Sequence, residues 1–137
     1  MDRASLLKQY ALGQRNFASS NLLETDLIAA ELSGMDLSYA DLRQCRLGRA
    51  NFSGADFQGA DLIESLLWGT DLTEANLDQA ILRETDLTGA KLIRAQLSDA
   101  YLAKASLCGV NLAGATLAGA MLFDADLSAS DDRRTDL

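Results

Sequence analysis

Histidine is absent from this chain of 137 residues. Its absence removes the commonest general base and the commonest metal ligand of proteins, and with them any Ser/His/Asp catalytic set. The sequence also lacks a Cys-x-x-Cys pair, a Gly-x-Ser-x-Gly segment and a phosphate-binding loop of the Gly-x-x-x-x-Gly-Lys-Ser/Thr type. We therefore expect no enzyme activity, no cofactor, no metal and no small-molecule substrate.

Long apolar runs are missing as well. A membrane-spanning helix needs about 20 consecutive apolar residues, so the sequence predicts no membrane span, and it shows no signal peptide. The length suits a single domain.

What the chain does have is a strict period of five. Every fifth residue from Leu12 to Leu127 is Leu or Phe, at 24 positions without a break. Two residues earlier lies a column of small residues, in which 14 of the 22 positions from Ser20 to Ala125 are alanine. The residue between the columns is usually Asp or Asn. A period of five fits neither an α-helix nor a single strand, so the repeat Ala-(Asp/Asn)-Leu-x-x must set the architecture.

Each repeat is expected to form one short side and one corner of a coil. Alanine and leucine two apart point to the same side of an extended segment, and the three following residues must then bend. Repeated corners of one hand close a coil, and coils stack about 4.8 Å apart with parallel hydrogen bonding. Glycines two residues after the leucine would occupy turn positions with positive φ. With a coil of 20 residues, these glycines fall on three of the four corners and are absent from the fourth, and this regularity favours that coil length. These glycines are Gly34, Gly54, Gly59, Gly69, Gly89, Gly109, Gly114 and Gly119.

The repeat resembles that of the pentapeptide-repeat family over about residues 15–130. This resemblance implies an all-β fold, a right-handed quadrilateral β-helix with four pentapeptides in each of about six coils. The segments LLKQYALGQRNF, LLWGTDL, ILRETDLTGAKL, ASLCGVNL and DRRTDL are also similar to a cyanobacterial member of the family. That relative regulates heterocyst differentiation by binding the master regulator of the process, and it continues into further coils after the last matching segment.

The first 14 residues depart from the repeat and are predicted to form a short capping α-helix. Asp2 suits the N-cap and Gly13 the stop, and one face of the helix would be apolar. The helix is expected to cover the N-terminal end of the core, and a partner-binding helix is the alternative. The apolar face consists of Leu6, Leu7, Tyr10 and Ala11.

Residues 15–130 are assigned to the β-helix and 131–137 to a C-terminal tail. Asp132 stands where a core leucine is due, and Leu137 completes a last Thr-Asp-Leu. The segment folds over the last coil, or the end of the core docks against something, or the chain is part of a longer repeat protein. An exposed apolar end favours an end-to-end homodimer through the C-terminal coil.

The two cysteines are expected to be unpaired. Cys45 belongs to the inward column and Cys108 points outward, three coils away, which is too far for a disulfide. Unpaired thiols favour a reducing compartment, here the cytoplasm. The net charge of −8 is interpreted as a solvated surface that keeps the rod soluble.

One side of the expected coil is more apolar outside than the other three. It is the side whose core leucines recur every 20 residues from Leu22, and the only tryptophan lies around its next corner. Apolar and aromatic side chains mixed with arginine are typical of interaction surfaces, although solenoids also tolerate scattered exposed apolar residues. The candidate partner-binding residues are Ile63, Leu66, Trp68, Ile81, Arg83, Tyr101, Met121 and Phe123.

Three functions remain open at this stage. The first is a non-enzymatic protein-binding scaffold that docks on and regulates a partner protein, for which the resemblance implies the master regulator of heterocyst differentiation. The second is a DNA-mimicking inhibitor or modulator of a type II topoisomerase such as gyrase, because some family members resemble a DNA duplex in width and charge. A mimic needs a continuous anionic belt, which 12 Lys and Arg residues interrupt here. The third is a structural rod with no dedicated partner. Nucleic-acid and membrane partners are not expected.

Overall fold

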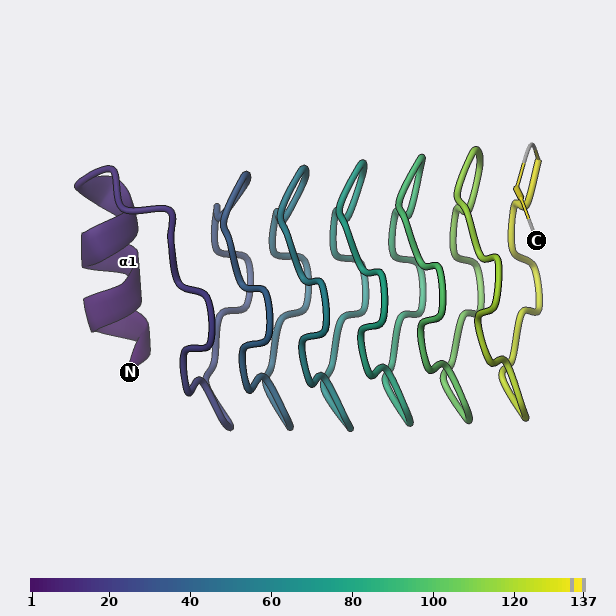
Figure 1. The fold of residues 1–137 in the computed structure, drawn as a ribbon, viewed down its shortest axis with the longest axis horizontal. Helices are drawn as coiled ribbons and strands as arrows, with labels where there is room; N and C mark the ends of the chain where they lie inside the picture. Colours follow the sequence, from purple (N-terminus) through teal and green to yellow (C-terminus); the bar gives the residue numbers. More distant parts are fainter. Residues whose placement is uncertain (134, 137) are drawn as a thin grey trace.

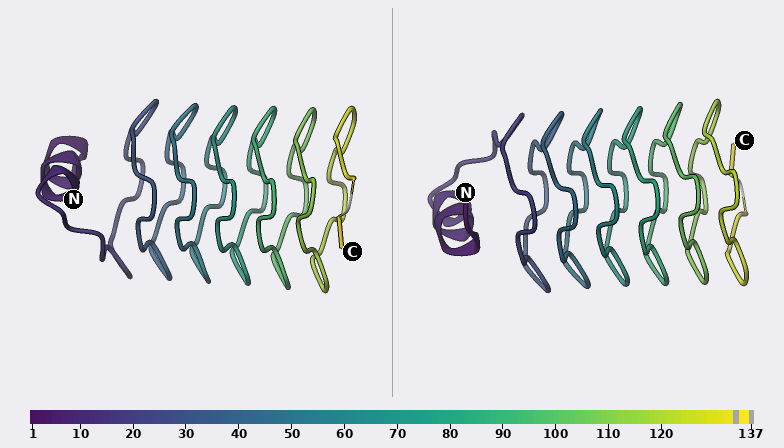
Figure 2. Two further views of the ribbon diagram at one scale, coloured as in Figure 1. Left: turned by 90° about the horizontal axis from the view of Figure 1, so that it is seen from above. Right: turned by 90° about the horizontal axis from the view of Figure 1, so that it is seen from below.

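The protein is a rod of stacked coils with one helix at its N-terminal end (Figure 1). The computed structural model describes residues 1–133, 135 and 136. Within that part of the chain the helix α1 spans Arg3–Ala11, and the remainder winds along the long axis. The two termini therefore lie at opposite ends of the rod, as the further views in Figure 2 also show.

Parallel bridges join each coil to the next. Among the described residues 21 bridges occur, and each connects a residue to the one 20 positions later, from Asn16 with Asp36 to Thr116 with Asp136. One turn of the coil therefore takes four pentapeptides. Because a turn follows every bridged residue closely, the expected parallel sheets are rows of single bridges, and the described residues contain no longer strand. The expected number of about six coils stays a prediction.

The corners are tight turns with a left-handed residue two positions after each core residue. The eight predicted glycines all have positive φ, between 64° and 75°. Fifteen other residues at equivalent corners, such as Glu24 and Lys104, have φ between 56° and 61°. The next N–H closes the turn by donating to the core residue's carbonyl, as from Ser20 to Phe17 at 3.2 Å. None of the corner residues is β-branched, which fits the high cost of positive φ for such side chains.

The core is the Leu/Phe column together with the small column, as predicted. From Phe17 to Leu117 every Leu or Phe of the column is at most 4% exposed. Leu12, the first leucine of the five-residue period, is the C-cap of α1 and is 79% exposed, so the buried column begins at Phe17. Leu6, which is fully buried, packs against the end of the core instead. At the other end Leu127 is 38% exposed.

Helix α1 begins and ends as the sequence predicts. The Asp2 carboxylate accepts a hydrogen bond from the Ser5 N–H at 2.8 Å, and Gly13 has a φ of 97° just after the helix. Ala11, predicted to share the apolar face, is exposed instead, because the helix turns it away from the first coil.

Side chains of α1 attach the helix to the first coil. Leu6 is buried, and the Tyr10 hydroxyl donates to the Ser33 carbonyl at 2.8 Å. The Arg3 guanidinium donates to the Asp26 carbonyl at 3.0 Å. These contacts make the helix a lid on the N-terminal end of the core, which was the first of the two predictions for it.

Both cysteines are free, as expected. The buried Cys45 thiol donates to the Leu22 carbonyl at 2.9 Å, and burial raises the pKa of this thiol to about 11. Cys108 is half-buried. The low polarity around Cys45 keeps its thiol neutral and unreactive.

The segment after residue 130 continues the register of the coils. Asp131 bridges Asn111, and the Thr135 hydroxyl donates to the Leu112 carbonyl at 2.8 Å. The exposed Asp132 borders a hollow of about 110 Å³ whose other walls include the last core leucines. The expectation for Leu137 lies outside the described residues.

Candidate docking face

The Asp or Asn before each core residue has a structural role. Its side-chain oxygen accepts a hydrogen bond from the N–H two residues later, as from Ser38 to Asp36 at 2.9 Å. This N–H lies at the start of the corner and has no backbone acceptor, so the side chain caps it. All 14 Asp and Asn residues at this position from Asn16 to Asp131 make the contact, at 2.9–3.2 Å. Much of the negative charge is thus part of the fold.

On one side of the rod apolar residues replace this cap in three consecutive coils. They are Ile81, Tyr101 and Met121, stacked on one another through the bridges from Ile81 to Tyr101 and from Tyr101 to Met121. Tyr101 is 46% exposed and Met121 45%. The N–H groups that a cap would satisfy, of Arg83, Ala103 and Phe123, have no protein acceptor among the described residues.

A second column runs along the same side, two residues further on. It contains Ile63, Arg83 and Phe123, and Phe123 is 73% exposed. The structure thus brings six of the eight predicted residues onto one side of consecutive coils. We call this set the apolar face: Ile63, Ile81, Arg83, Tyr101, Met121 and Phe123.

The other two predicted residues lie around the next corner. Leu66 is 39% exposed and bridges Arg46 in the preceding coil. The Trp68 indole lies against Gly48, where a Cβ atom would collide with the ring, and the Arg49 guanidinium is 5.4 Å from the ring centroid. Trp68 therefore packs partly against the rod itself, a contact that the sequence did not predict. Gly48 was the available signal, because it lies outside the corner positions that hold most glycines.

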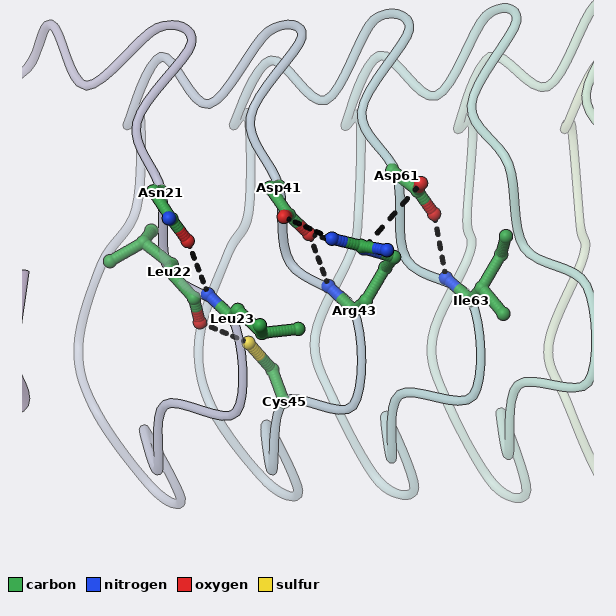
Figure 3. Close-up of polar contacts among 8 residues, drawn as sticks. All are labelled: Asn21, Leu22, Leu23, Asp41, Arg43, Cys45, Asp61 and Ile63. Atoms are coloured by element: carbon green, nitrogen blue, oxygen red, sulfur yellow. Dashed lines mark hydrogen bonds and ion pairs between the residues drawn. The ribbon is translucent and has the colours of Figure 1, made fainter.

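Carboxylates and arginines are paired next to the apolar face. Arg43 Nη2 lies 2.8 Å from Asp41 Oδ2, and Arg43 Nε lies 3.9 Å from Asp61 Oδ2 in the next coil (Figure 3). The hydrogen bond from the Arg43 side chain lowers the pKa of Asp41. Figure 3 also shows Asn21 and Asp61 capping the N–H groups of Leu23 and Ile63.

A shallow groove of about 360 Å³ crosses this region. Leu23 and Ile63 are its apolar lining, and Arg43 and Arg83 lie between and beside them. Its corner side is formed by Glu24, Gln44 and Glu64.

Two further findings concern other kinds of site. Across residues 1–133, 135 and 136 no three His, Cys, Asp or Glu side chains are grouped so that they would hold a metal ion. In the same residues no helix has the length and apolar character needed to cross a bilayer.

Five-residue units stacked around a Leu/Phe core, with one apolar side left open, define a repeat protein of the solenoid class. The chain belongs to the pentapeptide-repeat family, whose profile of pentapeptide repeats matches eight copies within residues 16–49, 30–69, 50–89 and 90–128. The family resemblance is thereby confirmed. A comparison with curated protein sequences found no match.

Solved structures show the same fold. HetL, a pentapeptide-repeat protein involved in heterocyst differentiation regulation from the cyanobacterium Nostoc sp. strain PCC 7120, is 56% identical to this chain with a TM-score of 0.94. The match covers 100% of this chain and 58% of HetL, and HetL is a right-handed β-helix. A trypsin-treated variant of QnrB1, a plasmid-mediated fluoroquinolone resistance protein, is 19% identical over 85% of this chain and 64% of that protein, with a TM-score of 0.54. The likeness to QnrB1 shows the fold alone.

Proposed function

We propose that this protein is a non-enzymatic scaffold that docks on and regulates a partner protein through the apolar face. The proposed partner is HetR, the master regulator that the resemblance to HetL implies, and the proposed setting is the cytoplasm of a heterocyst-forming cyanobacterium. HetL is involved in heterocyst differentiation regulation, and the chain spans 58% of its length.

The observation that carries the proposal is the loss of the cap at three adjacent positions. Asp or Asn at Ile81, Tyr101 and Met121 would satisfy one more backbone N–H each, as happens at Asp41 and Asp61 in the same column. A hydrogen bond contributes about 1 kcal/mol to stability, so apolar residues at these positions forgo a local stabilisation that Asp or Asn would provide. Exposed apolar side chains that replace stabilising ones and cluster on one side support a binding role.

The test is a pull-down with purified HetR as the named candidate. The parent protein is compared with the double variant Ile81→Asp/Tyr101→Asp, after circular dichroism has shown that both keep their β signal. We expect capture of HetR by the parent and loss of capture by the variant, because two carboxylates in a desolvated contact are costly.

A matched control is available on another side of the same coils. Gln96→Asp/Thr116→Asp places two carboxylates at the equivalent motif positions and changes the net charge equally. This control should capture HetR as well as the parent does. Equal capture by the parent and by Ile81→Asp/Tyr101→Asp would remove the apolar face from the proposal, and no capture by the parent would remove HetR.

The DNA-mimic hypothesis is the second proposal. The fold shared with QnrB1 is compatible with it. However, ion pairs such as Arg46 with Asp26 at 3.2 Å and Arg94 with Glu74 at 2.7 Å neutralise parts of the surface. A gyrase supercoiling assay tests it, since inhibition at low protein concentration that salt abolishes would favour the mimic.

A second copy of the chain is a subsidiary proposal for the C-terminal end. Leu112, Leu117, Leu122 and Leu127 border the hollow there, and Leu127 is 38% exposed. End-to-end pairing would cover these side chains. Light scattering after size-exclusion chromatography would show a dimer for the parent and a monomer for Leu127→Glu, whereas a parent that stays monomeric at every concentration would contradict the pairing.

A further inference from the structure

The apolar face and the neighbouring corner that carries Glu24 and Glu64, here called the acidic corner, restrict the shape and the charge of a partner. This inference rests on the proposed function and concerns the chemistry of the partner. The backbone first restricts the mode of binding. On the sides of the rod N–H and C=O groups point along its axis to neighbouring coils, as in the bonds from Ile81 N–H to Ala60 O at 2.9 Å and from Leu62 N–H to Ile81 O at 2.8 Å. A side therefore has no free edge on which a partner strand would add.

A partner on this side must bind through side chains that repeat along the axis. Ile81, Tyr101 and Met121 follow one another at the coil spacing of about 4.8 Å. The turns of an α-helix repeat every 5.4 Å, so a helix laid along the rod keeps a stripe of side chains in contact over about three turns. Alternate residues of a strand repeat at about 6.7 Å and lose register after one coil.

The charged side chains around the groove then indicate the charge of the helix that binds there. Arg43 is paired with Asp41 at 2.8 Å, and Arg83 with Glu84 at 3.5 Å. Glu24 and Glu64, on the corner side of the groove, form no ion pair among the described residues. The groove therefore presents unpaired carboxylates beside an apolar strip.

The spacing of these carboxylates matches a helix. Glu24 and Glu64 occupy the same corner two coils apart, which is about 9.6 Å along the axis. Residues i and i+7 of a helix are about 10.5 Å apart along the helix axis. Two Lys or Arg residues at that separation would meet both carboxylates, while the apolar stripe of the same helix continues over Tyr101, Met121 and Phe123.

We infer that the apolar face binds a basic amphipathic helix of the partner, which lies along the rod axis with cationic side chains at Glu24 and Glu64. The acidic corner sets the charge of the partner, and the apolar column supplies the contact area.

The test uses the full chain and two synthetic peptides of about 16 residues, a length that covers about five coil spacings. Both carry leucines on one stripe, one has lysines at i and i+7 beside that stripe, and the other has glutamates there. Fluorescence anisotropy should show at least about tenfold tighter binding of the lysine peptide, and added NaCl should reduce the difference. Equal affinities for the two peptides would overturn the inference.

A variant of the acidic corner and a control variant elsewhere on the rod test which carboxylates cause the preference for the lysine peptide. Glu24→Lys/Glu64→Lys should weaken the lysine peptide about tenfold and strengthen the glutamate peptide. The corner accepts this change, because Lys104 stands in the same column with a φ of 60°. The control Gln79→Lys/Asp99→Lys/Ala129→Lys changes the net charge equally at exposed left-handed corners elsewhere and should leave the preference intact. The same loss in both variants would mean attraction to the whole acidic rod and would contradict the inference.

The same variants separate this inference from the proposed function. If the parent captures HetR and Glu24→Lys/Glu64→Lys captures it equally well, the acidic corner has no part in binding and the inference fails while the scaffold role stands. If the lysine peptide binds as expected and HetR is not captured, the choice of HetR fails and the inference about the face holds.

Discussion

The side chain before each core residue has one of two roles. An Asp or Asn there caps a backbone N–H and stabilises the fold, whereas an apolar residue leaves the N–H uncapped and is available for binding. Asp36 and Asp56 cap the N–H groups of Ser38 and Gln58, each at 2.9 Å. Ile81 and Tyr101 leave the equivalent groups uncapped, and Tyr101 is 46% exposed while Ile81 is half-buried. The same position therefore serves the fold in most coils and, under our proposal, the partner in a few.

We therefore predict a variant that is at least as stable to unfolding as the parent but captures less HetR. In Ile81→Asn/Tyr101→Asn each asparagine restores a cap worth about 1 kcal/mol, partly offset by lost packing of the half-buried Ile81. We expect urea unfolding to show a stability equal to that of the parent or up to about 1 kcal/mol higher, together with weaker HetR capture. A loss of more than about 2 kcal/mol would show that these residues serve the fold.

A second prediction at the residue scale concerns Asp41. Its pKa is lowered by Arg43, so the folded state binds a proton at this carboxyl less readily than the unfolded chain does. The stabilisation is present above the ordinary value of 3.8 and is lost as the pH falls through the lowered pKa. Because the pair is exposed, Asp41→Asn should cost less than about 1 kcal/mol at pH 7.

The pH series provides the check. The difference between parent and Asp41→Asn in urea unfolding should shrink as the pH falls from 7 to below 3.8. Asp56→Asn serves as a control, because Asp56 caps Gln58 and has no arginine partner among the described residues. A difference for Asp41→Asn that does not change with pH would contradict the role of the Arg43 pair.

At the scale of the element, α1 is the lid on the N-terminal end of the core, and Leu6 is its one fully buried side chain. Leu6 is fully buried against the core, whereas Leu12, the first leucine of the five-residue period, is 79% exposed. The hydroxyl of Tyr10 and the guanidinium of Arg3 hold the helix on carbonyls of the first coil. The lid therefore depends on Leu6 and hardly on Leu12.

The matched pair Leu6→Ala and Leu12→Ala tests this. Leu6→Ala should cost about 3 kcal/mol, because it leaves a cavity under the helix, and Leu12→Ala should cost less than about 0.5 kcal/mol. Thermal or urea unfolding measures both. Limited proteolysis near Gly13 should also accelerate only in Leu6→Ala. Similar costs for the two variants would mean that α1 does not close the core.

At the scale of the whole molecule, the burial of the core leucines differs between the middle coils and the last described coil. Core leucines in the middle coils, such as Leu67, are at most 1% exposed, but Leu127 is 38% exposed. Since each coil contacts only its neighbours, local stability of this chain is expected to be lower where Leu127 is less buried.

The same substitution should therefore have different costs along the rod. Leu67→Ala should lower the free energy of unfolding by about 3 kcal/mol and Leu127→Ala by less than about 1 kcal/mol. Hydrogen exchange should show faster exchange of the amides in residues 117–133 than in residues 57–97. Equal costs and uniform protection would show a rod that unfolds as one unit.

The period, the core, the corners and the N-cap of α1 could all be predicted from the sequence. These features are local, because a five-residue unit places its leucine inward and its turn at the corner whatever the neighbouring coils contain. The position of the apolar face also followed from the sequence, since a coil of 20 residues aligns Ile81 with Tyr101 and Met121.

The side-chain contacts between coils and at the N-terminal end of the rod were not predictable from the repeat and are seen in the folded structure. Trp68 packs on Gly48, 20 residues earlier, and Arg43 reaches Asp61 in the next coil. Leu6 fills the N-terminal end of the core, whereas Leu12 of the five-residue period is exposed. These contacts depend on how whole coils stack and on how α1 packs against the first coil, and the period of five residues specifies neither.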